Sequence, residues 1–324
     1  MKKRIFIGFL SALALSACQK NAWEMGDNTV RFAAYQDGMT KVTGTNFDAG
    51  DEIAVFAPLA GETIDGQYDT LVAGKAVDCR YVADNFNNFT AKTDGDKIRY
   101  STASTLLDFY AVYPAQGPAP KYAVTDRNTF KIDLGDISDQ RVKGAVIPYI
   151  YSNNATSRKA SDGVVMLRFK NIFSKIAVDV AYDPVMMGDT LSKVEFYADG
   201  GLFRECVIDL KNVDYASLAT NGGRNTLATL QSPYRFASPL KENTYTEGYI
   251  IPGTAINPVI RLTFGGTVPK VYTCRIPTTD SKVVYQAGMA YTYQVSIEDA
   301  VEVGIGGTIE EWVAAGDVPT IEAH

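Results

Sequence analysis

The fold of this chain is decided by the stretch Lys175-Ile176-Ala177-Val178-Asp179-Val180-Ala181-Tyr182. The stretch has the length of a short helix, but its β-branched residues recur at every second position. This alternation places one set of side chains on a buried face of a strand, and β-branched residues favour strands over helices. The sequence here therefore predicts a β-strand.

Short alternating runs of the same kind recur along the rest of the chain, separated by Gly, Asn, Asp and Pro, which favour turns. They lie at residues 29–35, 51–57, 97–100, 107–114, 129–134, 145–151, 164–169, 194–197, 205–210, 248–251, 259–264, 271–276 and 291–297. No window of a dozen residues keeps a 3.6-residue period, as an amphipathic helix would. The chain is therefore predicted to be all-β.

A polar segment at residues 152–163, S-N-N-A-T-S-R-K-A-S-D-G, separates two sets of these runs. Its small and polar residues are typical of a connection between domains. The chain is also long enough for two domains that each bury a core. We expect two tandem antiparallel β-sandwich domains, at residues 28–157 and 158–324.

The first 17 residues have the plan of a secretory signal peptide. Basic residues at positions 2–4 precede an apolar run, which is shorter than the roughly 20 residues needed to span a bilayer. Leu15-Ser16-Ala17-Cys18 resembles the bacterial lipobox, in which the cysteine is acylated and the chain is cut in front of it. We expect residues 1–17 to be removed, Cys18 to carry the lipid anchor, and residues 18–27 to form a linker. The alternative is an ordinary signal peptide that contains a cysteine.

Composition argues against several classes of function. The net charge of -6 at pH 7 argues against nucleic acid or anionic lipid as a partner. The single histidine, His324, is the last residue, which removes the usual nucleophilic triads and His-rich metal sites. Asp94 and Asp96 lack further oxygen ligands at the spacing of a calcium loop, and neighbouring carboxylates at positions 310–311 lie on opposite faces of a strand. We expect no enzymatic activity, no metal and no cofactor.

Three further cysteines follow Cys18. Cys206 and Cys274 can form a disulfide in an oxidising compartment, which would leave Cys79 unpaired. The alternative is three buried, inert thiols. The spacing of the cysteines does not fit a zinc site.

Four stretches form a more specific set: residues 41–56, 107–114, 165–176, and 287–297 with 309–312. In this order, and after a lipobox, they resemble the fimbrillin family of Bacteroidales, which supplies subunits and accessory lipoproteins of type V pili. The chain departs from the family pattern at Asn171, where a histidine is usual. The resemblance extends over nearly the whole chain and implies transthyretin-like β-sandwich domains.

The resemblance also implies a mode of assembly. In the family, subunits reach the outer membrane as lipoproteins, and a protease cuts after a basic residue to remove the leader with the first strand. The groove that this exposes accepts a strand from the next subunit, because unpaired backbone groups and alternating pockets receive it. Candidate cut sites are Arg31 and Lys41; the alternative is that neither is cut and the protein stays lipid-anchored, as an anchor or a standalone surface lipoprotein. The expected partners are other pilus subunits, the outer membrane through the lipid, and a host protein or glycan in cell adhesion.

The candidate donor strand lies near the C-terminus. Its apolar positions are Val301, Val303, Ile305, Ile309 and Trp312. The alternative is that this segment completes the second domain of its own chain.

A rival hypothesis is a carbohydrate-binding surface lipoprotein of a glycan-uptake system. Such a protein would share the anchor and the β-sandwiches, but it would need an exposed aromatic row. The chain has 19 Tyr and 15 Phe, most of which we expect in the core.

Overall fold

The computed structural model describes residues 28–36, 47–61, 77–115, 121–122, 131–141, 146–182, 191–213, 226–228, 234–237, 244–265, 267–278, 280–297 and 303–311. In these ranges the chain forms strands β1 to β21, with two short 3-10 turns at Asp94–Asp96 and Ala160–Asp162. The prediction of an all-β chain is confirmed. No helix of the described part is long and apolar enough to cross a membrane.

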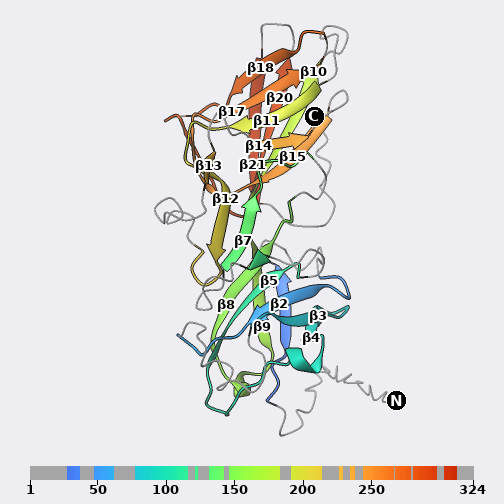
Figure 1. Ribbon diagram of the computed structural model, residues 1–324, viewed down its shortest axis with the longest axis vertical. Coiled ribbons are helices and arrows are strands. Elements are labelled where there is room, and N and C mark those ends of the chain that lie inside the picture. Colours follow the sequence, from blue (N-terminus) through green and yellow to red (C-terminus); the bar gives the residue numbers. More distant parts are fainter. Residues whose placement is uncertain are drawn as a thin grey trace, which may run out of the picture.

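Seven strands close into a barrel, in the order β1-β4-β3-β2-β5-β8-β9 (Figure 1, lower half). They are β1 (Phe32–Gln36), β2 (Glu52–Phe56), β3 (Cys79–Ala83), β4 (Asn88–Ala91), β5 (Leu107–Tyr113), β8 (Ile150–Arg158) and β9 (Val165–Asn171). Neighbouring strands are antiparallel, except β1 and β9, which are parallel. The alternation in the sequence produces this arrangement, since β9 buries every second residue from Val165 onward.

A hairpin leaves the barrel between β5 and β8. Its strands are β6 (Lys121–Tyr122) and β7 (Lys131–Asp136), and they extend a sheet with β12 (Leu202–Asp209) and β13 (Thr226–Ala228) in the order β13-β12-β7-β6. In Figure 1, β7 and β12 lie between the barrel and the upper sheets. Early and late segments of the chain are therefore interleaved.

The upper half holds two four-stranded sheets, β15-β10-β20-β21 and β14-β11-β17-β18, and a two-stranded sheet, β16-β19. The first sheet contains β10 (Ser174–Tyr182), β15 (Thr244–Ile250), β20 (Met289–Ile297) and β21 (Val303–Glu311). The second contains β11 (Leu191–Tyr197), β14 (Tyr234–Ala237), β17 (Val259–Phe264) and β18 (Lys270–Arg275), and the pair is β16 (Gly253–Ile256) and β19 (Lys282–Tyr285). The stretch at residues 175–182 is therefore a strand, as predicted.

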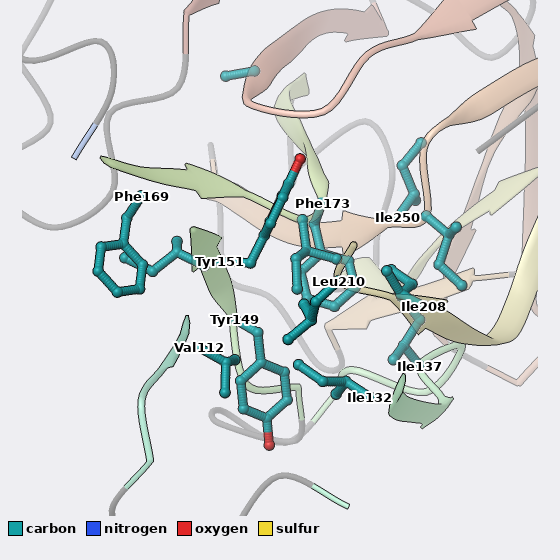
Figure 2. Packing of buried hydrophobic residues seen from close by; sticks show 14 of the residues in the cluster. Val112, Ile132, Ile137, Tyr149, Tyr151, Phe169, Phe173, Ile208, Leu210 and Ile250 are labelled. Carbon is teal, nitrogen blue, oxygen red and sulfur yellow. The ribbon is translucent and has the colours of Figure 1, made fainter. Parts of the chain in front are cut away.

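One apolar core runs from the barrel into the upper half. Figure 2 shows Val112, Ile132, Ile137, Tyr149, Tyr151, Phe169, Phe173, Ile208, Leu210 and Ile250 packed around the junction. These side chains come from barrel strands, from β7, β12 and β15, and from residues directly beside these strands, and all of them are buried. The two halves are joined by continuous packing as well as by the backbone.

The polar segment at residues 152–163 is not a loop throughout, because residues 152–158 belong to β8. Its polar character has a local cause at Asn154. The Asn154 side chain accepts a hydrogen bond from the backbone N–H of Arg168 (2.8 Å) and donates one to the carbonyl of Met166 (3.0 Å). An amide side chain thus takes the place of a strand partner beside β9.

Candidate functional site

β1 is the strand that completes the barrel. All five of its residues pair in parallel with β9, from Phe32 opposite Val165 to Gln36 opposite Phe169. On its other side, Phe32 and Ala33 pair with β4, and the Ala34 N–H donates to the carbonyl of Asn87 at 3.1 Å. The residues just before β1 are also bonded on this side, since the Val30 N–H donates to the carbonyl of Ile98 at 2.8 Å. Without β1, the order of strands would be open between β9 and β4. A strand that entered this place would find backbone partners on both sides.

The inward face of β1 fills the barrel core. Val30, Phe32, Ala34 and Gln36 point inward and are buried. The Phe32 ring lies edge-to-face on Tyr81, with ring centroids 4.8 Å apart, and on Phe109, at 5.2 Å. Edge-to-face pairs of this kind add to the stabilisation from burial.

Tyr81, beneath Phe32, is itself fixed in the core. Its hydroxyl oxygen accepts a hydrogen bond from the backbone N–H of Ile98 at 3.0 Å. Burial raises the pKa of Tyr81 well above its usual value, so the phenol is neutral. The Tyr81 side chain, against which Phe32 packs, is therefore uncharged and held by a hydrogen bond.

The outward face of β1 is exposed. Arg31 and Tyr35 face solvent, and Tyr35 lies opposite Arg168 of β9. The carbonyl of Arg31 accepts a hydrogen bond from the N–H of Val165 at 2.9 Å. The Arg31 backbone is thus tied to β9, directly before β1 begins.

The two candidate cut sites lie on opposite sides of β1 in the sequence. A cut after Arg31 would leave β1 joined to the rest of the barrel. A cut after Lys41 would separate β1 from it. Lys41 itself lies outside the described residues.

The candidate donor segment forms β21. Its backbone pairs antiparallel with β20 over nine residue pairs, from Val303 opposite Ile297 to Glu311 opposite Met289. Val303, Ile305 and Ile309 lie on this strand, at positions that share one face. In this structure β21 is an edge strand of its own sheet. Val301 and Trp312 lie outside the described residues.

Of the cysteines in the predictions, only some lie in the part of the chain that the structure describes. Cys18 lies outside the described residues. Cys274, on β18, is a buried free thiol, and burial raises its pKa to about 11. Cys206 lies on β12, in a different sheet, and its side chain is outside the described part. The disulfide stays a prediction.

The acidic residues weighed as metal ligands serve the local structure. Asp96 accepts hydrogen bonds from the Arg80 N–H (3.1 Å) and the Thr93 hydroxyl (2.7 Å), and Asp94 pairs with Lys97 at 2.6 Å. Within the described ranges, no three His, Cys, Asp or Glu side chains are grouped in a way that could hold a metal ion.

Asp108 is a structural carboxylate that the sequence reasoning did not single out. It is buried on β5 and accepts hydrogen bonds from the backbone N–H of Ser157 (2.7 Å) and of Gly61 (3.0 Å). It therefore ties β5 to β8 and to the loop after β2.

The sequence analysis also did not predict that β1 lies between β9 and β4, or that the side chain of Gln36 is buried. The alternation of Val30, Phe32 and Ala34 puts Gln36 on the same face. That period was the available signal that a glutamine points into the core.

The class that these features define is an all-β protein whose barrel is closed by its first strand. A family model described as fimbrillin-like matches residues 40–312, and the chain belongs to this family. No curated protein matches the chain.

Several solved structures share the fold at low sequence identity. A candidate cell adhesion protein from Bacteroides uniformis is 18% identical, with a TM-score of 0.59 over 89% of this chain and 100% of that one. A second, from Bacteroides ovatus, is 16% identical, with a TM-score of 0.59 over 90% and 99%. A fimbrial protein from Bacteroides vulgatus is 12% identical, with a TM-score of 0.53 over 88% and 99%.

Proposed function

We propose that this protein is a cell-surface lipoprotein of the outer membrane that acts as a structural or accessory subunit of a type V pilus, with a role in adhesion. Assembly proceeds by protease-triggered strand exchange at the place of β1. The observation that carries the proposal is the barrel, because its ring is closed by the first strand of the chain, which lies between β9 and β4. Membership of the fimbrillin-like family supports it.

The first step is anchoring and cutting. Acylated Cys18 holds the chain at the membrane, since each buried methylene contributes about 0.8 kcal/mol. A cut after Lys41 then detaches the segment that contains both the lipid and β1. Arg31 is the poorer site, because its carbonyl is bonded to β9 and a cut there leaves β1 in place.

The second step is replacement. Loss of β1 exposes the core around Tyr81 and Phe109, and burying large apolar side chains there again is worth roughly 1.5–3 kcal/mol each. An extended segment from another subunit supplies those side chains and the backbone partners. The donor is the segment of residues 301–312, most of which forms the edge strand β21 before exchange.

We also propose that the chain forms two tandem transthyretin-like domains, with a boundary that differs from the one expected at residues 157 and 158. Both β8 and β9 are strands of the barrel, which supports a first domain that ends after Asn171. The β7 hairpin then belongs structurally to the junction with the second domain.

Brief trypsin treatment of the purified chain tests the proposal. Mass spectrometry should find a new N-terminus after Lys41, and native gels should show a ladder of assembled species. Lys41→Ala should remain monomeric, whereas Arg31→Ala should assemble like the wild type. A wild-type chain that is cut at Lys41 and still runs as a monomer would contradict the proposal.

One observation keeps carbohydrate binding as a second candidate. Tyr35 is 44% exposed, and Phe86 is 81% exposed in the turn between β3 and β4. Asp84 holds that turn by accepting the backbone N–H groups of Phe86 (2.7 Å) and Asn88 (2.9 Å). Retention on polysaccharide gels that Phe86→Ala abolishes would favour this function.

A further inference from the structure

Gln36, the last residue of β1, is a buried polar side chain without a matching environment. It is 9% exposed and lies opposite Phe169 on β9. Its Nε2 atom is buried and has no hydrogen-bond partner in the part of the chain that the structure describes. A buried amide N–H group without a partner loses its hydration and gains nothing in return, which destabilises the folded state.

A second buried glutamine shows that this is not a general feature of the protein. Gln140 is 8% exposed, but its Nε2 donates to the carbonyls of Ile137 (2.7 Å) and Tyr249 (2.6 Å). Its Oε1 accepts the N–H of Tyr249 at 2.8 Å. Gln140 thus completes the edge of β15, whereas Gln36 contributes an unpaired donor to the barrel core.

We propose that the buried amide of Gln36 weakens the binding of β1 between β9 and β4. A strand that enters this position therefore binds better if it has an apolar residue where β1 has Gln36. This inference rests on the proposed strand exchange. The strand that fits has a large apolar residue at each of the first two inward positions, a small one at the third and an apolar one at the fourth. The first three are set by Val30, Phe32 and Ala34.

The occupant we infer is residues 303–309 of a second copy. In sequence, Val303, Ile305, Gly307 and Ile309 have the same spacing as Val30, Phe32, Ala34 and Gln36, with a small residue at the third position and an apolar one at the fourth. The exchange replaces the Phe32 ring by a smaller side chain and removes the unpaired amide. Gln36 therefore favours the entering strand over β1 at one defined position.

The stability of the intact chain tests the role of Gln36 without any exchange. Gln36→Met keeps the length of the side chain and removes the amide, so the thermal unfolding midpoint should rise by about 2 °C or more. The matched control Gln140→Met should lower the midpoint, because it removes the hydrogen bonds of Gln140 to Ile137 and Tyr249. A midpoint for Gln36→Met at or below that of the wild type would overturn the inference.

Peptide uptake tests the selection. After the cut at Lys41, a fluorescent peptide of residues 301–312 should replace β1, and Gln36→Met should slow the replacement by roughly tenfold. The same peptide with Ile309→Gln should bind roughly tenfold more weakly. Equal binding of the two peptides would overturn the selection. If the wild-type chain took up neither peptide, the proposed strand exchange would fail, and the unfolding midpoint of Gln36→Met would still decide the role of Gln36.

Discussion

The barrel and the upper half each contain one parallel pair of strands in otherwise antiparallel surroundings, but the two pairs are held very differently. β20 pairs with β10 over eight residue pairs and with β21 over nine. β1 pairs with β9 over five and with β4 over two. Each ladder pair adds backbone hydrogen bonds, so β20 has the longer ladders and β1 the shorter ones. The stretch around β1 gains a few further bonds, since Ala34 N–H donates to the Asn87 carbonyl (3.1 Å) and Val30 N–H to the Ile98 carbonyl (2.8 Å). The shorter ladders of β1 support our proposal that β1 is the strand that is replaced.

The largest expected effect comes from Phe32→Ala, which attacks the side-chain contacts of β1. Loss of the ring from Tyr81 and Phe109 should lower the free energy of unfolding by about 3–5 kcal/mol, measured by urea denaturation. The matched change Tyr35→Ala, on the outward face, should cost less than about 1 kcal/mol. Equal effects of the two changes would mean that β1 is not anchored by its inward face.

A smaller effect on the free energy of unfolding is expected from Asp108→Ala. This change weakens the contacts among β5, β8 and the loop after β2, and it does not touch β1. Two backbone N–H groups, of Ser157 and Gly61, lose their acceptor, and stability should fall by about 1–3 kcal/mol. Hydrogen exchange should show the loss of protection at β5 and β8, with β20 unchanged. Loss of protection in β20 as well would show that the halves unfold as one unit.

Tyr293→Phe probes the firmly held strand β20. It removes the hydrogen bond between the hydroxyls of Tyr293 and Tyr285, which lie 2.7 Å apart in the core. We expect a loss of about 1 kcal/mol in urea denaturation and no change in the uptake of a donor peptide by the barrel. Faster uptake would contradict the separation of the two strands.

The smallest effect near neutral pH concerns the same tyrosine. Burial raises the pKa of Tyr293 to about 12, whereas an unfolded tyrosine titrates near pH 10. The stabilisation is therefore complete below pH 10 and is lost as the pH rises from about 10 to 12, because the unfolded chain ionises first. Denaturation at pH 9 and pH 11 should show a smaller loss for Tyr293→Phe than for the wild type, and an equal loss would contradict this assignment.

Local structure could be predicted from the sequence because the two-residue period is a local signal. The alternation at residues 175–182 marks β10, and the short apolar run at 107–114, which a proline ends, marks β5; both are strands. The period gives the face that each residue occupies, but it does not give the partner of a strand. The insertion of β1 between β9 and β4, and the pairing of β7 with β12, depend on contacts between distant segments.

The candidate site was predicted only in outline. Arg31 was expected inside a strand pattern and lies directly before β1. The polar residues around Asn154 suggested a loop, because their bonds to β9 are visible only in three dimensions. Gln36 was not singled out, since the predicted strand ended at residue 35. The position of Gln36 opposite Phe169 depends on strand pairing, which no local pattern contains.

A cross-linked barrel tests most directly whether β1 is the strand that is replaced. Ala33 and Met166 are paired across β1 and β9, so Ala33→Cys combined with Met166→Cys allows a disulfide between the two strands. After the cut at Lys41, the oxidised double variant should take up no donor peptide and form no assembled species, and reduction should restore both. Assembly of the oxidised protein at the wild-type rate would show that β1 stays in place and that subunits join elsewhere.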